Sequence, residues 1–225
     1  MNNAAENQRP QLEARLRITE VFRSLQGEAA TAGLPTIFVR LTGCPLRCQY
    51  CDTAYAFTGG ESRSLDNIMS EVVGLNTQHV CVTGGEPLAQ PGCRHLLTML
   101  CDAGLTVSLE TSGAIDIAGV DPRVSRVVDI KTPGSDEVSR NRWENIDLLT
   151  AHDQVKFVVC SREDFDWAVE IEARYSLSER CEVWVSPSFE QVAPTALAEW
   201  LLASGAPLRM QTQLHKALWG DAPGR

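Results

Sequence analysis

The hydrophobic and polar positions along the chain fall into short β-branched runs separated by stretches of helical periodicity. The apolar runs predict strands over residues 36–41, 80–83, 106–109, 127–130, 154–159, 182–185 and 208–211. The stretches between them predict helices over residues 64–75, 93–103, 163–175 and 195–203, among which Ser64 and Pro194 mark helix starts. This alternation predicts an α/β fold with a mostly parallel sheet and right-handed crossovers. Because parallel sheets place their chemistry at the carboxyl ends of strands, a site is expected in the loops that follow them.

Length and composition favour an enzyme of a reducing compartment. The 225 residues suffice for one sizeable core, and residues 1–15 are polar, so we expect a disordered tail over 1–15 and a single domain over 16–225. No apolar stretch is long enough to span a membrane, and no signal peptide is recognisable, which predicts a cytoplasmic protein. A net charge of −9 argues against a nucleic-acid partner and favours a small substrate.

Three of the eight cysteines form a C-x3-C-x2-C motif, with Cys44, Cys48 and Cys51 following the strand predicted over 36–41. Three thiolates can hold three irons of a cubane iron–sulfur cluster, which needs four ligands for complete coordination. The fourth iron can then bind S-adenosylmethionine through its amino and carboxylate groups. A zinc site with a remote fourth ligand is the alternative, although no second cysteine pair follows, as it usually does in zinc knuckles. The remaining cysteines are expected to be buried small hydrophobes, namely Cys81, Cys93, Cys101, Cys160 and Cys181.

A second motif, Thr83-Gly84-Gly85-Glu86-Pro87, comes directly after the strand predicted over 80–83. Its two glycines let the backbone approach a ligand closely, with amide groups free to bind the polar ends of that ligand. Alone, the motif is equally typical of an ordinary turn between a strand and a helix. Together with a cysteine loop one strand earlier, it becomes much more specific.

The two motifs together resemble those of the radical S-adenosylmethionine superfamily. The resemblance implies a partial (βα) barrel in which Cys44, Cys48 and Cys51 bind a [4Fe–4S] cluster. It also implies that Gly85 and Glu86 meet the aminoacyl group of S-adenosylmethionine. The cofactor supplies a 5′-deoxyadenosyl radical, while the protein orients it and excludes competing reactions.

Further segments are similar to the 7-carboxy-7-deazaguanine synthase family, over roughly residues 18–219. They are Ser24-Leu25-Gln26-Gly27-Glu28, Arg40, Cys51-Asp52-Thr53 and the run from Gln211 to Lys216. The resemblance implies conversion of 6-carboxy-5,6,7,8-tetrahydropterin to 7-carboxy-7-deazaguanine with loss of ammonia, in the biosynthesis of queuosine and other 7-deazapurines. It also implies Mg²⁺, a homodimer, and an electron donor such as a flavodoxin.

The residue chemistry suits a pterin. Gln26 and Glu28 can recognise its donor and acceptor edge, and Arg40 can bind its carboxylate as a bidentate fork. Thr53 can give Mg²⁺ a hard oxygen ligand. Without the resemblance, Gln26 and Glu28 would suit a solvated turn, Arg40 a surface ion pair, and His215 a core position at the end of a strand. The resemblance places in the substrate site Leu25, Gln26, Gly27, Glu28, Arg40, Thr83 and His215.

The remaining correspondences concern S-adenosylmethionine. Residues 129–131 stand where many family members carry Ser-Pro-Lys, and residues 186–189 match a later cofactor-binding turn in Pro187. The cofactor contacts implied are Tyr50, Asp52, Gly85, Glu86, Asp129, Lys131, Ser186, Pro187, Ser188 and Phe189.

Two rival functions share some of these features. Glycyl-radical enzyme activases have the same cysteine spacing and a strand similar to Asp129-Ile130-Lys131, but an activase must admit a peptide loop and has no use for Gln26 and Glu28 as pterin readers. A zinc-stabilised binding module is the rival without catalysis, and iron and sulfide analysis distinguishes it from an iron–sulfur protein.

Overall fold

The protein is described here by a computed structural model that covers residues 14–220, 222 and 224. In the described residues one sheet runs in the order β3-β1-β2-β4-β5-β6-β7-β8-β9. Its strands are β1 (Arg15–Leu25), β2 (Pro35–Leu41), β3 (Glu61–Ser64), β4 (His79–Gly84), β5 (Thr106–Thr111), β6 (Ser125–Asp129), β7 (Gln154–Val159), β8 (Glu182–Pro187) and β9 (Arg209–Met210). The α-helices are α2 (Leu65–Gly74), α3 (Cys93–Asp102), α4 (Arg162–Tyr175), α5 (Pro194–Ser204) and α6 (Leu214–Trp219).

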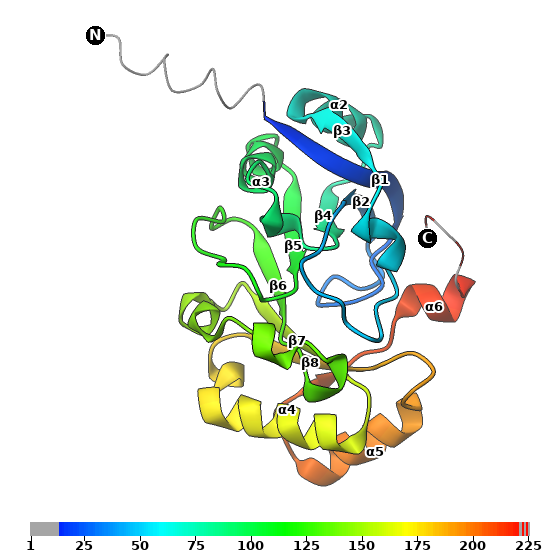
Figure 1. The fold of residues 1–225 in the computed structure, drawn as a ribbon, viewed down its shortest axis with the longest axis vertical. Helices are drawn as coiled ribbons and strands as arrows, with labels where there is room; N and C mark the ends of the chain where they lie inside the picture. The colour runs from blue at the N-terminus through cyan, green and yellow to red at the C-terminus, as the bar shows by residue number, and fades with distance from the viewer. Residues whose placement is uncertain (1–13, 221, 223, 225) are drawn as a thin grey trace.

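The sheet is mostly parallel and open. Every neighbouring pair from β2 to β9 is parallel, whereas β1 is antiparallel to both β2 and β3. Because β3 and β9 are edge strands, the sheet does not close on itself. The predicted partial barrel is therefore confirmed (Figure 1).

The predicted helices form where their caps predict. The Ser64 hydroxyl accepts a hydrogen bond from the Asn67 amide at the start of α2, and Pro194 occupies the first turn of α5. Ser161 caps α4 in the same way through the amide of Asp164. Helices α4 and α5 pack beside each other next to β7 and β8 (Figure 1).

Two strands, β1 and β3, were absent from the sequence prediction. Strand β1 carries charged residues throughout, and only its first half alternates clearly, with Leu16 and Ile18 buried. Strand β3 has the sequence ESRS and is held by backbone pairing with Arg15–Ile18, which hydrophobic patterning cannot reveal. Since Arg15 begins β1, the predicted tail ends one residue too late, and residues 1–13 lie outside the described part.

The alternation of strands and helices is also less complete than predicted. Chain segments 112–124 and 130–153, which join β5 to β6 and β6 to β7, contain no α-helix and instead run through loops and 3-10 turns.

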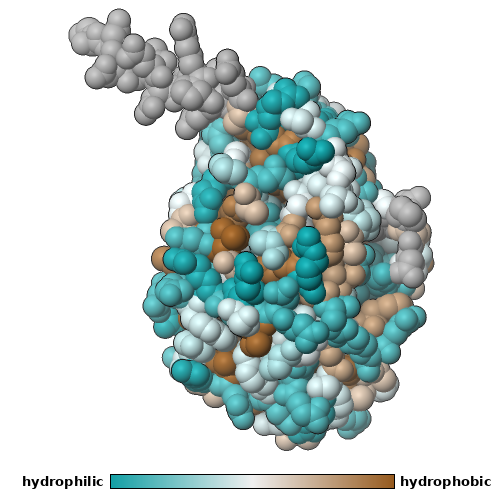
Figure 2. Space-filling model, in the orientation of Figure 1, coloured by the Kyte–Doolittle hydropathy of each residue, from teal (hydrophilic) through white to brown (hydrophobic). Residues whose placement is uncertain are grey.

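The core is continuous from one end of the sheet to the other. Buried side chains such as Val39 of β2, Leu97 of α3, Phe157 of β7 and Phe165 of α4 belong to one cluster. Each such side chain contributes about 1.5–3 kcal/mol through burial. On the face seen in Figure 2, hydrophobic residues appear in small groups among hydrophilic ones. No helix among the described residues has the length and apolar character needed to cross a membrane.

Four of the cysteines outside the motif are buried as predicted: Cys81, Cys93, Cys101 and Cys181. The prediction for Cys160 is wrong, because this residue is only half-buried. Its sulfur lies 3.3 Å from Nε2 of Gln49, which belongs to the cysteine loop. Cys160 thus packs against the cysteine loop rather than in the core.

Candidate active site

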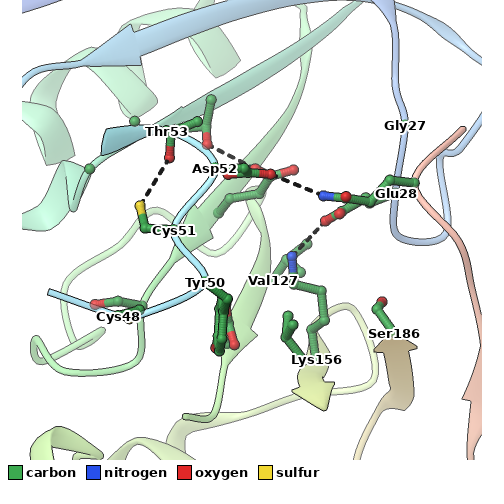
Figure 3. Close-up of a pocket in the computed structure, with 18 of the residues that line it drawn as sticks. Gly27, Glu28, Cys48, Tyr50, Cys51, Asp52, Thr53, Val127, Lys156 and Ser186 are labelled. Atoms are coloured by element: carbon green, nitrogen blue, oxygen red, sulfur yellow. Dashed lines mark hydrogen bonds and ion pairs between the residues drawn. The ribbon is translucent and has the colours of Figure 1, made fainter. Parts of the chain in front are cut away.

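A cavity of about 230 Å³ opens at the carboxyl ends of the parallel strands. The ends of β2, β4, β5, β6, β7 and β8 contribute to its wall, together with the cysteine loop and residues next to α6. Figure 3 shows part of this wall, with Lys156 directed toward Glu28 and Cys51 beside Thr53. The cavity brings together nearly all predicted site residues: Leu25, Gln26, Gly27, Glu28, Arg40, Cys44, Cys48, Tyr50, Cys51, Asp52, Thr53, Thr83, Gly85, Asp129, Lys131, Ser186, Pro187, Ser188, Phe189 and His215.

The cysteine loop is held in place by hydrogen bonds to the turn that follows β6. The amide of Gln49 donates to the carbonyl of Ser135 at 3.2 Å, and the amide of Arg47 donates to a carboxylate oxygen of Glu137 at 2.5 Å. Within the loop, the amide of Cys51 donates to the carbonyl of Cys48 at 3.2 Å. These bonds fix the backbone that carries the three half-buried thiols.

The thiols of Cys44, Cys48 and Cys51 fit a cubane cluster with one open iron. All three line the cavity, and three thiols on one loop are the donor set that such a cluster needs, so the fit rests on the chemistry of these ligands. Burial raises the pKa of Cys48 to about 11, while the charge of Lys131 opposes that rise. The net shift still favours the protonated thiol, so iron binding at this residue has to release its proton.

The Gly84-Gly85 pair packs directly on the cysteine loop. A Cβ on Gly84, whose φ is +142°, would lie 2.2 Å from the carbonyl oxygen of Leu41. A Cβ on Gly85 would lie 2.2 Å from the carbonyl oxygen of Gly43 and 2.8 Å from Cβ of Cys44. The two glycines, predicted to let a ligand approach, thus also let the turn after β4 pack against the backbone of residues 41–44, next to the first cysteine.

Glu86 is the exception among the predicted site residues. It is fully buried, does not line the cavity, and accepts hydrogen bonds from the amides of Leu88 and Ser112 at 2.9 and 2.7 Å. The hydroxyls of Thr111 and Ser112 also donate to its carboxylate. The side chain of Glu86 thus braces the turn after β4 against the end of β5, and the predicted contact between Glu86 and the cofactor stays a prediction.

Three buried polar atoms of the cavity wall lack a hydrogen-bond partner among the described residues: Oη of Tyr50, Oδ1 of Asp129 and Oγ of Ser186. An unsatisfied buried polar group costs about 1–3 kcal/mol, so their clustering indicates a place for a polar ligand. Lys131 lies among them, with Nζ 2.7 Å from Oδ2 of Asp129 and 5.6 Å from the centre of the Tyr50 ring. Burial lowers the pKa of Lys131, but the charge and hydrogen bond of Asp129 and the neighbouring cysteines together raise it by more, so the net shift is upward.

Phe189 lies at the exposed rim of the same cavity, with half of its surface accessible. Pro187 is the last residue of β8, and Ser188, which follows it, is buried. The segment 186–189 thus runs from the inner wall to the mouth of the cavity.

Gln26 and Glu28 lie in the loop after β1 and are buried, which excludes the solvated turn. Oε1 of Gln26 accepts from the amide of Gly27 at 2.8 Å, and its Nε2 lies 3.3 Å from a carboxylate oxygen of Glu110. Oε2 of Glu28 lies 2.5 Å from Nζ of Lys156. Both side chains are therefore held by residues of other strands, Glu110 of β5 and Lys156 of β7.

The Glu28–Lys156 pair is ionised despite its burial. Burial raises the pKa of Glu28, but the charge and hydrogen bond of Lys156 reverse this effect, and the net pKa lies below the ordinary value. For Lys156, burial lowers the pKa, but the charges of Glu28, Asp129 and Glu110 and the hydrogen bond to Glu28 together raise it by more, so the net shift is upward. Each charge therefore stabilises the ionised form of the other group.

Arg40 pairs with Glu20 on β1, with Nε 2.7 Å from Oε1. Its guanidinium lies between the rings of Phe22 and Tyr55, at 5.9 Å from each centre. Its terminal nitrogens have no hydrogen-bond partner among the described residues, so they remain available to an anion in the cavity. The next strand places Thr83 directly opposite Arg40 in register.

The position predicted for His215 is wrong in its local structure, because the residue lies in α6 rather than at the end of a strand. Gly27 permits this placement, since a Cβ there would lie 2.2 Å from Nδ1 of His215. The amide of Leu214 donates to the carbonyl of Gly27 at 3.0 Å, and Nε2 of Gln213 donates to Oδ2 of Asp52 at 3.1 Å. The C-terminal segment thus connects the loop after β1, which carries Gln26 and Glu28, to the cysteine loop.

Thr53 immediately precedes the short 3-10 turn that closes the cysteine loop, and its hydroxyl oxygen lies 3.7 Å from the sulfur of Cys51. Several further cavity residues were missed as site residues by the sequence analysis, among them Glu110, Lys156 and Gln213. For the first two a signal exists, because each is a charged residue within a strand whose neighbours are buried. Such a residue needs a partner, but the sequence does not say which one.

Comparisons with known proteins agree with this site. The model of the radical SAM superfamily matches residues 38–171, more than half of the chain. The fold, the cysteine loop and this match define a radical S-adenosylmethionine protein.

Within that superfamily, the chain belongs to the 7-carboxy-7-deazaguanine synthase family. It is 44% identical to the protein of that name from Chlorobaculum tepidum, over 94% of this chain and 98% of the relative. The protein of the same name from Koribacter versatilis is 40% identical, over 91% and 97%. The crystal structure of QueE from Escherichia coli, at 24% identity, has the same fold, with a TM-score of 0.76 over 95% of this chain and 100% of that one. These findings do not favour the glycyl-radical activase or the zinc-binding module.

Proposed function

We propose that this chain converts 6-carboxy-5,6,7,8-tetrahydropterin to 7-carboxy-7-deazaguanine with release of ammonia, as a step of queuosine and 7-deazapurine biosynthesis. Relatives that bear the name of this activity match almost the whole chain. The observation that carries the proposal is one cavity with two kinds of wall: three cysteines on one side, and a buried amide and carboxylate at Gln26 and Glu28 on the other.

On the cysteine side, Cys44, Cys48 and Cys51 would hold a [4Fe–4S] cluster, and S-adenosylmethionine would lie beside it. Together these groups supply a carbon-centred radical able to remove hydrogen from an unactivated C–H bond. The protein's part is to bind and orient. The unpartnered oxygens of Tyr50 and Asp129 suit the polar groups of the cofactor, and so does that of Ser186.

On the other side, Glu28 accepts hydrogen bonds from the donor edge of the pterin, and Gln26 offers an amide beside it. The free guanidinium nitrogens of Arg40 bind the pterin carboxylate as a fork. Thr53 gives Mg²⁺ one oxygen ligand next to the cysteine loop, with the remaining positions left to substrate oxygens and water. Leu25, Gly27, Thr83 and His215 complete the substrate wall.

The setting of the reaction belongs to the same proposal. Residues 16–225 act as one domain of a cytoplasmic homodimer, and a flavodoxin-type donor provides the electron that starts turnover. The single sheet and the continuous core support one domain.

Anaerobic turnover tests the function. The cluster-loaded protein is incubated with S-adenosylmethionine, Mg²⁺, dithionite and carboxytetrahydropterin, and the products are identified by mass. The proposal predicts 7-carboxy-7-deazaguanine and ammonia in equal amounts. Recovery of unchanged pterin from a protein that cleaves the cofactor would refute it.

A further inference from the structure

Lys156 is a buried charge whose role the proposed reaction does not explain. It lies in the middle of β7, in register with Asp129 of β6 and Trp184 of β8, and it lines the cavity. Its side chain is only 13% exposed. A lysine so placed costs several kcal/mol unless it is paired.

Its partner comes from a distant part of the chain. Nζ of Lys156 lies 2.5 Å from Oε2 of Glu28, although the two residues are separated by 128 positions in the sequence. Figure 3 shows the ammonium pointing from the strand toward this carboxylate across the cavity wall. The sheet places a fixed positive charge against the residue that is to recognise the pterin.

The other charged and polar neighbours do not replace Lys156. Glu28 also faces Gln213 and His215 of the C-terminal segment, of which the first is neutral. Lys156 faces two further carboxylates, Asp129 and Glu110, on the neighbouring strands. Without Lys156, Glu28 would keep its burial and lose the strongest cationic influence on it, and burial favours the protonated acid.

We propose that Lys156 is a positioning residue for substrate recognition: it fixes the carboxylate of Glu28 in its ionised form, so that Glu28 acts only as an acceptor toward the N–H donors of the pterin. This inference rests on the proposed function. An ionised carboxylate accepts hydrogen bonds at both oxygens, whereas a protonated one presents an O–H donor against the donor edge of the ligand. Lys156 contacts only Oε2, so it does not itself occupy Oε1.

The test is a pH series of pterin binding, measured by calorimetry on anaerobic, cluster-loaded protein with S-adenosylmethionine present. The variants are Lys156→Met, which keeps the length of the side chain without its charge, and Lys156→Arg, which keeps the charge. Dividing each dissociation constant by the wild-type value at the same pH removes the titration of the pterin itself. Iron content and the visible absorbance of the cluster check that each variant is folded.

For Lys156→Met we expect the ratio of dissociation constants, variant to wild type, to grow as the pH falls from about 8.5 to 5.5. Burial should raise the pKa of Glu28 in this variant, and below that pKa the ratio should approach a tenfold increase for each pH unit. Lys156→Arg should keep a ratio that is flat with pH. In a Glu28→Gln background, which cannot ionise, adding Lys156→Met should change affinity less than about threefold at any pH, because the two residues act as one unit. If the single variant does not fold, the comparison of Glu28→Gln with Glu28→Gln/Lys156→Met still tests the coupling, since the double variant removes both charges of the Glu28–Lys156 pair together.

A ratio for Lys156→Met that is independent of pH would overturn the inference, and so would an equal loss of affinity in the Glu28→Gln background. The latter result would mean that Lys156 contacts the pterin itself. Failure of the wild-type protein to bind or convert the pterin is a different outcome, which would reject the proposed function instead.

Discussion

The two sides of the cavity are built in opposite ways. The cysteine side is one short stretch, residues 44–53, and backbone hydrogen bonds to the turn after β6 hold it. The side proposed to bind the substrate joins residues far apart in the sequence, such as Gln26 to Glu110 across 84 positions and Glu28 to Lys156 across 128. Ligands that lie on one loop can be recognised in the sequence by their spacing. A surface whose residues come from different strands can be recognised only once the order of the strands in the sheet is known.

The largest effect is expected on the cysteine side. Cys44→Ala should abolish reductive cleavage of S-adenosylmethionine and lower the iron content, because a cubane with two cysteine ligands loses iron readily. Iron and sulfide analysis with a cleavage assay measures both. Cys160→Ala is the matched control, since Cys160 contacts the cysteine loop through Gln49 without belonging to the motif. If Cys44→Ala keeps four irons and full cleavage, the ligand assignment is wrong.

A second substitution tests whether the turn after β4 supports the cysteine loop. Gly85→Ala would place a Cβ 2.2 Å from the carbonyl oxygen of Gly43, so we expect lower cluster content and a loss of about 1–3 kcal/mol in the free energy of unfolding. Urea unfolding and iron analysis measure these quantities. Gly74→Ala, at a helical position with open space around it, should instead stabilise by up to about 1 kcal/mol. Equal behaviour of the two variants would argue against the backbone contact.

On the substrate side the expected effects are smaller and confined to binding. Arg40→Ala should weaken pterin binding by about 1.5–3 kcal/mol, roughly 10- to 150-fold, because a charged contact to the carboxylate is lost. Arg40→Lys should fall between this variant and the wild type, since it keeps the charge without the fork. Calorimetry on the cluster-loaded protein measures both. Unchanged affinity in Arg40→Ala would remove Arg40 from the substrate site.

The smallest change concerns Mg²⁺. Thr53→Ala should lower turnover and remove most of its dependence on magnesium concentration, whereas Thr53→Ser, which keeps the hydroxyl, should retain much of both. Turnover rates across a magnesium series measure the response. The same response in Thr53→Ala as in the wild type would rule out this ligand.

The same contrast explains what the sequence could predict. The parallel strands, four helices and the cysteine loop follow from hydrophobic periodicity, cap residues and spacing, which are all local. Strand β3 has no hydrophobic residue and depends on pairing with β1, so no local pattern marks it. Lys156 is visible as a charge within a buried strand, but its partner Glu28 follows only from the sheet. Glu86 belongs to a recognised motif, yet its side chain is occupied by hydrogen bonds from residues at the end of β5, which spacing does not reveal.

The central claim is that cofactor cleavage and pterin binding depend on different sides of one cavity. The most direct test compares Glu28→Ala with the wild type in two assays. One assay measures cofactor cleavage without pterin, and the other measures conversion of carboxytetrahydropterin by product mass. The account predicts that Glu28→Ala cleaves the cofactor at a rate close to that of the wild type, while its conversion of the pterin at low substrate concentration falls at least about tenfold. Undiminished conversion in Glu28→Ala, or a parallel loss of both activities, would contradict it.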